Sequence, residues 1–230
     1  MKHKFQTVVT SLVILVSSSG IIGCGDGKNS PEARIRILHA SPDAPNVDVL
    51  VDGGRVLEDA PYTADSGFLP VDAGRRHIAV NAAGTDTAVI DAAVDLIQDT
   101  DYLIVAAGKV ADIAPIVATV ERSEIPAASA RIRVLHAAAS ASPVDVYVTA
   151  SGDSIASAQP VLSGVPFRAI SDYLTVPVGS YDIRVTLAGT KTVAIEALGF
   201  PVDAGLRATV AALDAAGGGA PFTLQVVDEE

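Results

Sequence analysis

Histidines are the residues of this chain best suited to proton transfer or metal binding. They stand at positions 3, 39, 77 and 136. An imidazole titrates near neutral pH and can bind a metal ion through a free nitrogen, yet none of the four has another His or a Cys at the spacing of a metal site. The alternative is a histidine at a strand end whose ring bonds the backbone of a turn. The sequence favours this structural role for His39 and His136, and a surface position for His77.

Sequence patterns of known catalytic sites are missing from the chain. It contains no Gly-x-Ser-x-Gly elbow, no His-Glu-x-x-His, no P-loop and no Gly-x-Gly-x-x-Gly, the patterns that position a nucleophile, a zinc ion or a phosphate. Convergent catalytic triads are defined by geometry and leave no such pattern. We therefore expect a protein that is not an enzyme, without a cofactor or a bound metal, and keep an enzyme as the second hypothesis.

Acidic residues crowd two stretches of the first half of the chain. One stretch holds Asp43, Asp48, Asp52, Glu58 and Asp59, and the other holds Asp86, Asp91, Asp95, Asp99 and Asp101. Calcium takes about six to eight oxygen ligands, which several loops can supply together. No EF-hand spacing or Gly-Asp nonapeptide repeat is present, so a solvated acidic surface is the commoner meaning of such a pattern. Calcium binding stays open at this stage.

The charge balance narrows the class of partner. The chain has a net charge of −11, with 17 acids against 8 bases in residues 25–127 and 10 against 6 in residues 128–230. An acidic protein is a poor partner for nucleic acid or anionic lipid. Aromatic residues make up 4% of the chain and tryptophan is absent, which weighs against an aromatic platform for sugars. The more acidic first half favours contact with a cation or a basic partner.

The only cysteine, Cys24, lies at the end of a targeting segment. Two lysines precede an apolar stretch at 8–16, which is shorter than the about 20 residues of a membrane-spanning helix. Residues 21–24 (IIGC) resemble the lipobox of bacterial lipoproteins. This resemblance implies cleavage before Cys24 and attachment of lipid, palmitate included, to the new N-terminus; a free thiol in an ordinary signal peptide is the alternative. Gly25 then favours the outer membrane, with the periplasmic or the surface-exposed face undetermined.

A repeated sequence follows the polar tether at 25–32. Residues 33–40 (ARIRILHA) recur at 130–137 (ARIRVLHA) with seven of eight positions identical. The words Val-Asp-Val and Gly-Thr-x-Thr, from 47–49 and 84–87, recur in the same order in the second half. The second copy is longer by eight residues around 150–159, as expected for a larger surface loop. A duplicated domain explains this order.

Both copies have the pattern of short strands. Residues 34–37 and 47–51 alternate polar and apolar side chains, as half-buried strands do, and turns rich in glycine follow at short intervals. We expect further strands at 76–80, 87–94, 102–106 and 116–120, and in the second copy at 181–187, 192–198, 206–212 and 222–227. About seven strands in each copy predict an all-β fold with two tandem β-sandwich domains, of the immunoglobulin or transthyretin type.

The alternation also predicts an ion pair in each copy. Arg36 and Asp48, like the equivalent Arg133 and Asp145, lie between apolar residues of candidate strands, so both side chains would point to one outer face. On neighbouring strands each Arg and Asp would form a cross-strand pair worth about 0.2–1 kcal/mol. Replacing Arg133 by alanine would then lower the stability only slightly.

Four segments of the chain resemble a known family. They are RIRILHASPDAPNVDVLVDG, FLPVDAGRRHIAV, RIRVLHAAASASPVDVYV and YLTVPVGSYDIRV, and they are similar to bacterial surface domains of domain-of-unknown-function family 4397 (DUF4397). The second and fourth segments each contain a short apolar strand, a Gly turn and another strand. The resemblance covers nearly all of residues 33–227 in two copies. It implies a β-sandwich and an envelope or extracellular setting, with no known activity and no established site residues.

Together these patterns predict the organisation of the chain. We expect a lipoprotein signal peptide at 1–23, a lipidated Cys and flexible tether at 24–32, a β-sandwich at 33–121, a linker at 122–129 and a second β-sandwich at 130–230. The favoured function is a non-enzymatic binding, adhesion or envelope-organising module whose partner is a protein or an envelope polymer. The alternatives are a hydrolase of envelope polymers, or an accessory subunit of one, and a passive spacer.

Overall fold

The computed structural model describes residues 30–230, which are organised almost entirely in β-strands. The signal peptide, Cys24 and most of the tether lie outside these residues. The one helical element in the described part is the short 3-10 helix η1 (Val110–Asp112), and no helix there is long and apolar enough to cross a membrane. The prediction of an all-β protein is confirmed.

The first repeat contains eight strands in two sheets. They are β1 (Glu32–Ala40), β2 (Val47–Val51), β3 (Gly54–Ala60), β4 (Asp65–Asp72), β5 (Gly74–Ala82), β6 (Ala88–Leu96), β7 (Asp101–Ala107) and β8 (Ala114–Val120). Sheet A has the order β4-β1-β7-β8, and sheet B has the order β3-β2-β5-β6. Neighbouring strands are antiparallel except β1 and β7, which pair in parallel.

The second repeat has the same plan. Its strands are β9 (Ser129–His136), β10 (Val144–Ala150), β11 (Leu162–Val165), β12 (Leu174–Pro177), β13 (Gly179–Leu187), β14 (Val193–Val202), β15 (Arg207–Leu213) and β16 (Thr223–Asp228). Sheet C has the order β12-β9-β15-β16 and sheet D the order β11-β10-β13-β14, with β9 and β15 in parallel. The edge strands β3 and β11 were missing from the sequence-based prediction, so each sandwich has eight strands rather than about seven.

The strand order decides between the two expected types of sandwich. In immunoglobulin domains the first strand pairs with the second, whereas here β1 lies between β4 and β7 in one sheet while β2 lies in the other. This order leaves the transthyretin-like alternative. It also shows that the predicted ion pairs of Arg36 with Asp48 and of Arg133 with Asp145 are wrong, because β1 and β9 are not neighbours of β2 and β10.

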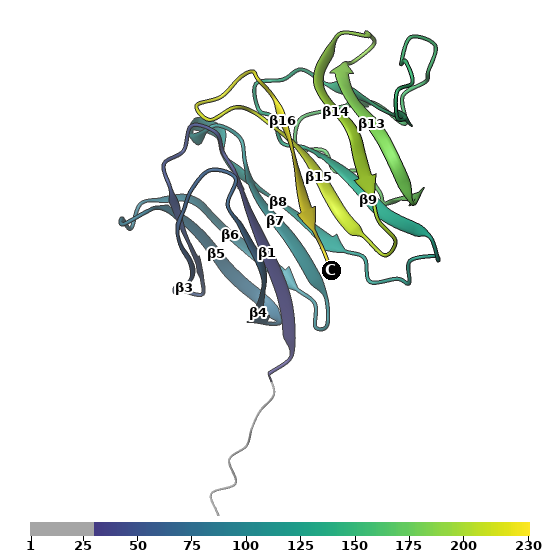
Figure 1. The fold of residues 1–230 in the computed structure, drawn as a ribbon. Coiled ribbons are helices and arrows are strands. Elements are labelled where there is room, and N and C mark those ends of the chain that lie inside the picture. Colours follow the sequence, from purple (N-terminus) through teal and green to yellow (C-terminus); the bar gives the residue numbers. More distant parts are fainter. Residues whose placement is uncertain (1–29) are drawn as a thin grey trace, which may run out of the picture.

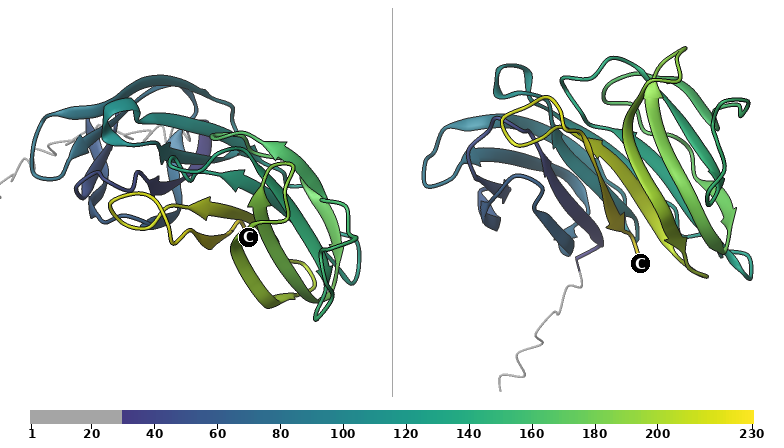
Figure 2. Two further views of the ribbon diagram at one scale, coloured as in Figure 1. Left: turned by 90° about the horizontal axis from the view of Figure 1, so that it is seen from above. Right: turned by 45° about the horizontal axis from the view of Figure 1, so that its top comes forward.

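The four sheets form one stack. From left to right in Figure 1 the layers are sheets B, A, C and D, and the views in Figure 2 show the same succession. Sheets A and C contact each other through a cluster of buried apolar side chains from both repeats, which we call the seam. Its buried members are Leu38, Ala40, Leu103, Val105, Ala107, Val120, Leu135, Ala137, Ala211, Leu213 and Val227. The two repeats are therefore domains that pack against each other through an apolar interface.

The central strands of sheets A and C carry the sequence signature of this stack. All seven residues of β7 and all seven of β15 are buried. A strand covered on both faces has a continuous apolar run instead of an alternating one, and β7 (DYLIVAA) has that pattern. One face of β7 fills the sandwich of repeat 1, with Tyr102, Ile104 and Ala106, and the other fills the seam, with Leu103 and Val105.

Candidate functional site

The two equivalent histidines are structural in their contacts. His39 in β1 and His136 in β9 are fully buried. Nε2 of His39 lies 3.4 Å from the carbonyl oxygen of Pro45, and Nε2 of His136 lies 3.2 Å from that of Ser142. Burial lowers the pKa of both imidazoles, although the carbonyl contact opposes it. A neutral ring facing a carbonyl oxygen donates its N–H to it, so each histidine fastens the loop that follows its strand.

The two equivalent aspartates hold turns. Asp48 in β2 and Asp145 in β10 are buried, and each carboxylate accepts two backbone hydrogen bonds. The donors are Asp59 and Gly84 for Asp48, and Gly164 and Gly189 for Asp145, at 2.7–3.2 Å. The hydrogen bond from the Asp59 N–H is the main cause that lowers the pKa of Asp48. This shared clamp explains why the Val-Asp-Val and Gly-Thr words occur in both copies.

The two equivalent arginines have different partners. Arg36 binds Asp65 of β4 through both arms of the guanidinium, at 2.7 and 2.6 Å. Arg133 is buried, and its Nη2 donates to Oε1 of Glu229 at 2.7 Å while Nε donates to Oγ1 of Thr209 at 2.8 Å. The second network was not predicted, because Glu229 is 96 residues away in the sequence.

The acidic stretches do not converge on one point. Asp101 binds Arg34 and Arg122, and Asp43 accepts the backbone N–H of Val110. Within residues 30–230 no three His, Cys, Asp or Glu side chains lie close enough together to hold a metal ion. The acids are thus bound one by one to backbone amides and arginines, or exposed, and they give a calcium site no support.

The outer face of sheet D is covered by a loop. Residues 151–161, which contain the eight extra residues of repeat 2, fold back over it, and Ile155 is only 8% exposed. Arg184 donates to the carbonyl oxygen of Asp153 at 3.0 Å, and Lys191 donates to that of Ala158 at 2.7 Å. The additional loop therefore has a buried anchor and closes this face of repeat 2.

The equivalent face of sheet B is open. The turn between β2 and β3 has only two residues, so nothing comparable to the 151–161 loop covers the sheet. The side chains of His77 and Asp91 are 51% and 65% exposed and pair with each other across β5 and β6. Asp95 on β6 is exposed as well. This acidic face, together with the β6 edge beside it, is the candidate binding site, and His77 lies at the surface as the sequence predicted.

A single residue exchange accompanies a difference between the two sheet edges. Asp182 occupies the position of His77 in repeat 2, and its carboxylate accepts the N–H groups of Gly199 and Gly152 at 2.9 and 2.8 Å. Two residues of β14, Leu198 and Gly199, lie opposite Asp182, and Gly199 has a φ of +66°. This is a β-bulge. In repeat 1, His77 lies opposite Ala93 with no extra residue.

A family match agrees with this duplicated architecture. A family model described as "Domain of unknown function (DUF4397)" matches residues 33–147 and 148–230. The chain belongs to this family. The boundary between the two matches falls inside β10 of the second DUF4397 copy, whereas the structure places the gap between the sandwiches after β8, which ends at Val120, and before β9, which begins at Ser129.

Solved structures similar to these DUF4397 copies share little sequence with them. One concerns α-glucan binding by a streptococcal virulence factor, with 13% identity over 78% of this chain and 93% of that chain and a TM-score of 0.24. Candidate adhesins of Bacteroides ovatus and Bacteroides fragilis have 10% and 11% identity, TM-scores of 0.25 and 0.24, and cover 87% and 86% of this chain and 96% and 98% of their own. Nothing about activity follows from likeness at this level. A comparison with curated proteins found no significant match.

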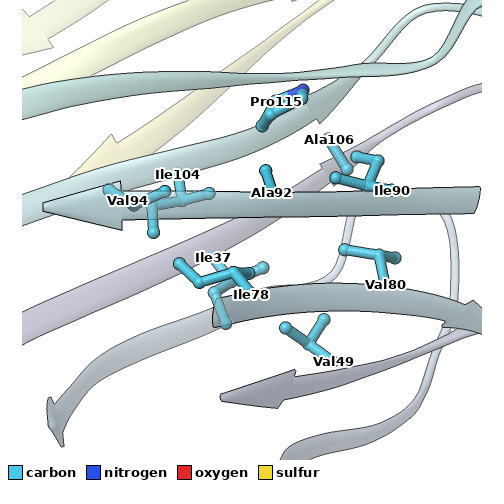
Figure 3. Close-up of a pocket in the computed structure, with 10 residues that line it drawn as sticks. All are labelled: Ile37, Val49, Ile78, Val80, Ile90, Ala92, Val94, Ile104, Ala106 and Pro115. Atoms are coloured by element: carbon cyan, nitrogen blue, oxygen red, sulfur yellow. The ribbon is translucent and has the colours of Figure 1, made fainter. Parts of the chain in front are cut away.

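The interiors of both DUF4397 sandwiches are filled. In repeat 1 side chains from sheets A and B point toward one another, as Figure 3 shows for Ile37, Ile78 and Ile104, and leave a void of about 10 Å³. In repeat 2 the void is about 40 Å³ and is lined by apolar side chains. Volumes of this size hold at most a few water molecules. Neither of these two voids has room for an organic ligand.

Proposed function

We propose that the protein is a lipid-anchored, non-enzymatic binding module of the bacterial cell envelope, and that it binds its partner through the outer face and edge of sheet B. The difference between the outer faces carries this proposal. Repeat 2 closes its outer face with the 151–161 loop, while repeat 1 leaves His77, Asp91 and Asp95 exposed on the same framework. A molecule that only separated two structures would have no need of an open face on one copy alone.

The state of the histidines supports binding over catalysis. A general acid or base must reach its substrate within hydrogen-bonding distance. His39 and His136 are sealed in the interior and bonded to loop carbonyls. A hydrolase that used His39 or His136 would need a deep pocket lined by one of them, and the filled interiors do not offer such a pocket.

The lipid anchor and the outer-membrane location rest on the leader sequence. Cys24 precedes β1 by eight residues, so a lipid there would hold sheet A close to the membrane surface. Labelling cells with radioactive palmitate should mark the wild-type protein and leave Cys24→Ala unlabelled. Density fractionation of the envelope then tests the outer-membrane assignment, which recovery of the protein in the inner membrane would contradict.

Site-specific photo-cross-linking tests the binding face. A photoreactive amino acid replaces Ala93 on β6, or Leu198 at the equivalent position of β14, in the full chain expressed in its own bacterium. Both residues are exposed. We expect adducts from position 93 and none from position 198, and digestion of the adducts with protease or glycosidase identifies the class of partner. Equal adducts from both positions would contradict the assignment to sheet B, and none from either would favour a passive spacer.

A further inference from the structure

We infer that the free edge of β6 binds an extended basic segment of another polypeptide as an additional strand of sheet B. This inference deepens the proposed function and rests on it. An unpaired strand edge offers a row of N–H and C=O groups to an incoming strand. β6 is hydrogen-bonded to β5 on one side and ends sheet B on the other.

From Asp91 to Leu96 the edge of β6 has no proline, glycine or bulge, because the one irregularity in its pairing with β5 lies at its start, between Ala88 and Ile90. Of the eight edge strands in residues 30–230, only β6 and β16 contain neither proline nor glycine, and β6 is the longer, with nine residues against six. The equivalent strand β14 carries the Gly199 bulge and Pro201. Bulges and prolines at an edge prevent another strand from pairing with it. Repeat 2 therefore blocks the position that repeat 1 leaves open.

Hydrogen bonding within sheet B identifies the free backbone groups. The N–H of Asp52 donates to the carbonyl oxygen of His77 at 2.8 Å, and the N–H of His77 donates to Oδ1 of Asp52 at 2.9 Å. The backbone of His77 thus points toward β2, away from β6. Because antiparallel pairs alternate between bonded and non-bonded, Ala93, opposite His77, directs its N–H and C=O to the free side. The same holds for Asp91 and Asp95, two residues away on either side.

Side-chain charge determines the chemistry of the occupant. The residues with free backbone groups, Asp91, Ala93 and Asp95, are all exposed. Residues directly opposite on paired strands place their side chains on the same face, with Cβ atoms about 4.5–5.5 Å apart. Lys or Arg at positions i and i+4 of the incoming strand would then meet Asp91 and Asp95, with a residue of any small type opposite Ala93. An extended basic segment is the complementary partner.

A second copy of this chain does not fit the same edge. In the antiparallel register that pairs all three residues, Asp91 of one copy lies opposite Asp95 of the other, and Asp95 lies opposite Asp91. Like charges directly opposite each other destabilise a sheet. The two aspartates therefore select against self-association through β6 while they favour a cationic strand.

Peptide binding to the full chain tests the inference. The probe is a fluorescent, end-blocked octapeptide, Thr-Lys-Val-Thr-Val-Lys-Val-Thr, whose lysines are four residues apart, and its affinity is measured by anisotropy. We expect Ala93→Pro, which removes one free N–H, to weaken binding by about tenfold or more. Glu196→Pro at the equivalent edge of repeat 2 should leave the dissociation constant unchanged. Asp91→Asn with Asp95→Asn should weaken binding and flatten its salt dependence.

A second measurement keeps the test decisive if Ala93→Pro misfolds. N-methylation of alternate residues of the peptide removes its N–H groups on one side only, so one methylated series should lose binding and the other should keep it. Equal binding of both series, equal binding to Ala93→Pro with an unchanged circular dichroism spectrum, or no binding of the lysine peptide would overturn strand addition. If photo-cross-linking still gave adducts at position 93, any of these results would contradict strand addition alone. Sheet B would then remain the proposed binding face.

Discussion

The two repeats differ most where they face away from each other. Sheets B and D have the same strand order, yet sheet D has a covering loop and a glycine bulge at Leu198–Gly199 in its edge strand, while sheet B has no covering loop and no bulge at the equivalent position. Asp182 contributes to both features of repeat 2, since its carboxylate binds Gly152 in the loop and Gly199 in the bulge. His77 at the equivalent position binds Asp91 on the open face instead. The aspartate at position 182 thus connects the loop that covers sheet D with the bulge in the edge strand of that sheet.

Facing the seam, equivalent residues keep their type and change their partners. Arg36 binds Asp65, and the position of Asp65 is occupied by Ile170 in repeat 2. Arg133 binds Thr209 and Glu229. Their positions are occupied by Leu103 and Val120 in repeat 1. Both repeats have the arginine, but its acidic partner lies on the neighbouring strand β4 in repeat 1 and just after β16, on the opposite side of the sheet, in repeat 2. Conserved position therefore does not imply conserved contacts within this molecule.

Removing Arg133 should have the largest effect. Its partner Glu229 has a fully buried side chain, and a buried charge left without its partner typically costs about 3–5 kcal/mol. We expect Arg133→Ala to lower the free energy of unfolding by that order in urea titrations. Arg36→Ala should cost less, because the side chains of Arg36 and Asp65 keep 13% and 19% of their exposure. Equal losses for the two variants would contradict the asymmetry of the seam.

Truncating the seam leucines should show whether the repeats unfold together. Leu38 and Leu135 are equivalent and fully buried between sheets A and C. Either change to alanine should cost about 2–5 kcal/mol and shift a single unfolding transition of the whole molecule, followed by calorimetry. Two transitions, of which only the substituted repeat's moves, would mean that the sandwiches are independent.

Exchanging Asp182 for histidine should make repeat 2 resemble repeat 1. The variant loses the acceptor of the Gly199 and Gly152 amides. We expect faster hydrogen exchange at both amides and a melting temperature lower by a few degrees. His77→Asp in repeat 1 is the matched control and should have a smaller effect, because no bulge amide faces that position. Unchanged exchange at Gly199 would show that the bulge does not depend on Asp182.

Acid should weaken both repeats in two steps. Burial lowers the folded-state pKa of His39 and His136. Their contribution to the free energy of unfolding is therefore fully present above the pKa of the unfolded chain, about 6.5. It is lost as the pH falls toward the pKa of the folded state. The lowered pKa values of Asp48 and Asp182, caused mainly by backbone hydrogen bonds, add a second loss only below about pH 4. Unfolding free energies measured from pH 7 to 5 should fall, and the double variant His39→Asn with His136→Asn should flatten that slope. A flat wild-type profile would contradict the expectation.

Local sequence patterns predicted the strands and the duplication but not the pairing of strands. Alternation at 34–37 and 47–51 correctly indicated two strands, and the repeated words correctly indicated two copies of one sandwich. Alternation of polar and apolar residues shows which side chains share a face of a sheet, but it does not show which strands are neighbours. For this reason the sequence-based prediction paired Arg36 with Asp48. β3 and β11 were missed because most of their residues are exposed or only partly buried, so GRVLEDA and LSGV lack a clear apolar alternation.

Two features that the strand predictions did not include had a signal in the sequence. The continuous apolar run of β7 indicated a strand covered on both faces, and thus a sheet packed on each side. Leu-Gly-Phe-Pro at 198–201 indicated an interrupted edge in repeat 2, where repeat 1 has Ala-Val-Asp at 93–95. The bond between Arg133 and Glu229 had none, since it joins the first strand of the repeat to the end of the chain.

The seam has the geometry of a symmetric homodimer joined into one polypeptide. Arg36 donates to the carbonyl oxygen of Asp228 and Arg133 to that of Thr119, and these two acceptors occupy equivalent register positions, so these two contacts mirror each other. Reciprocal contacts of this kind are typical of an isologous interface, and we expect residues 30–121 produced alone to sediment as a dimer. In an unfused ancestor of this kind, both outer surfaces would be encoded by one gene segment and would be identical. Fusion removes that constraint, and a single chain can then evolve one surface for recognition while the other is sealed.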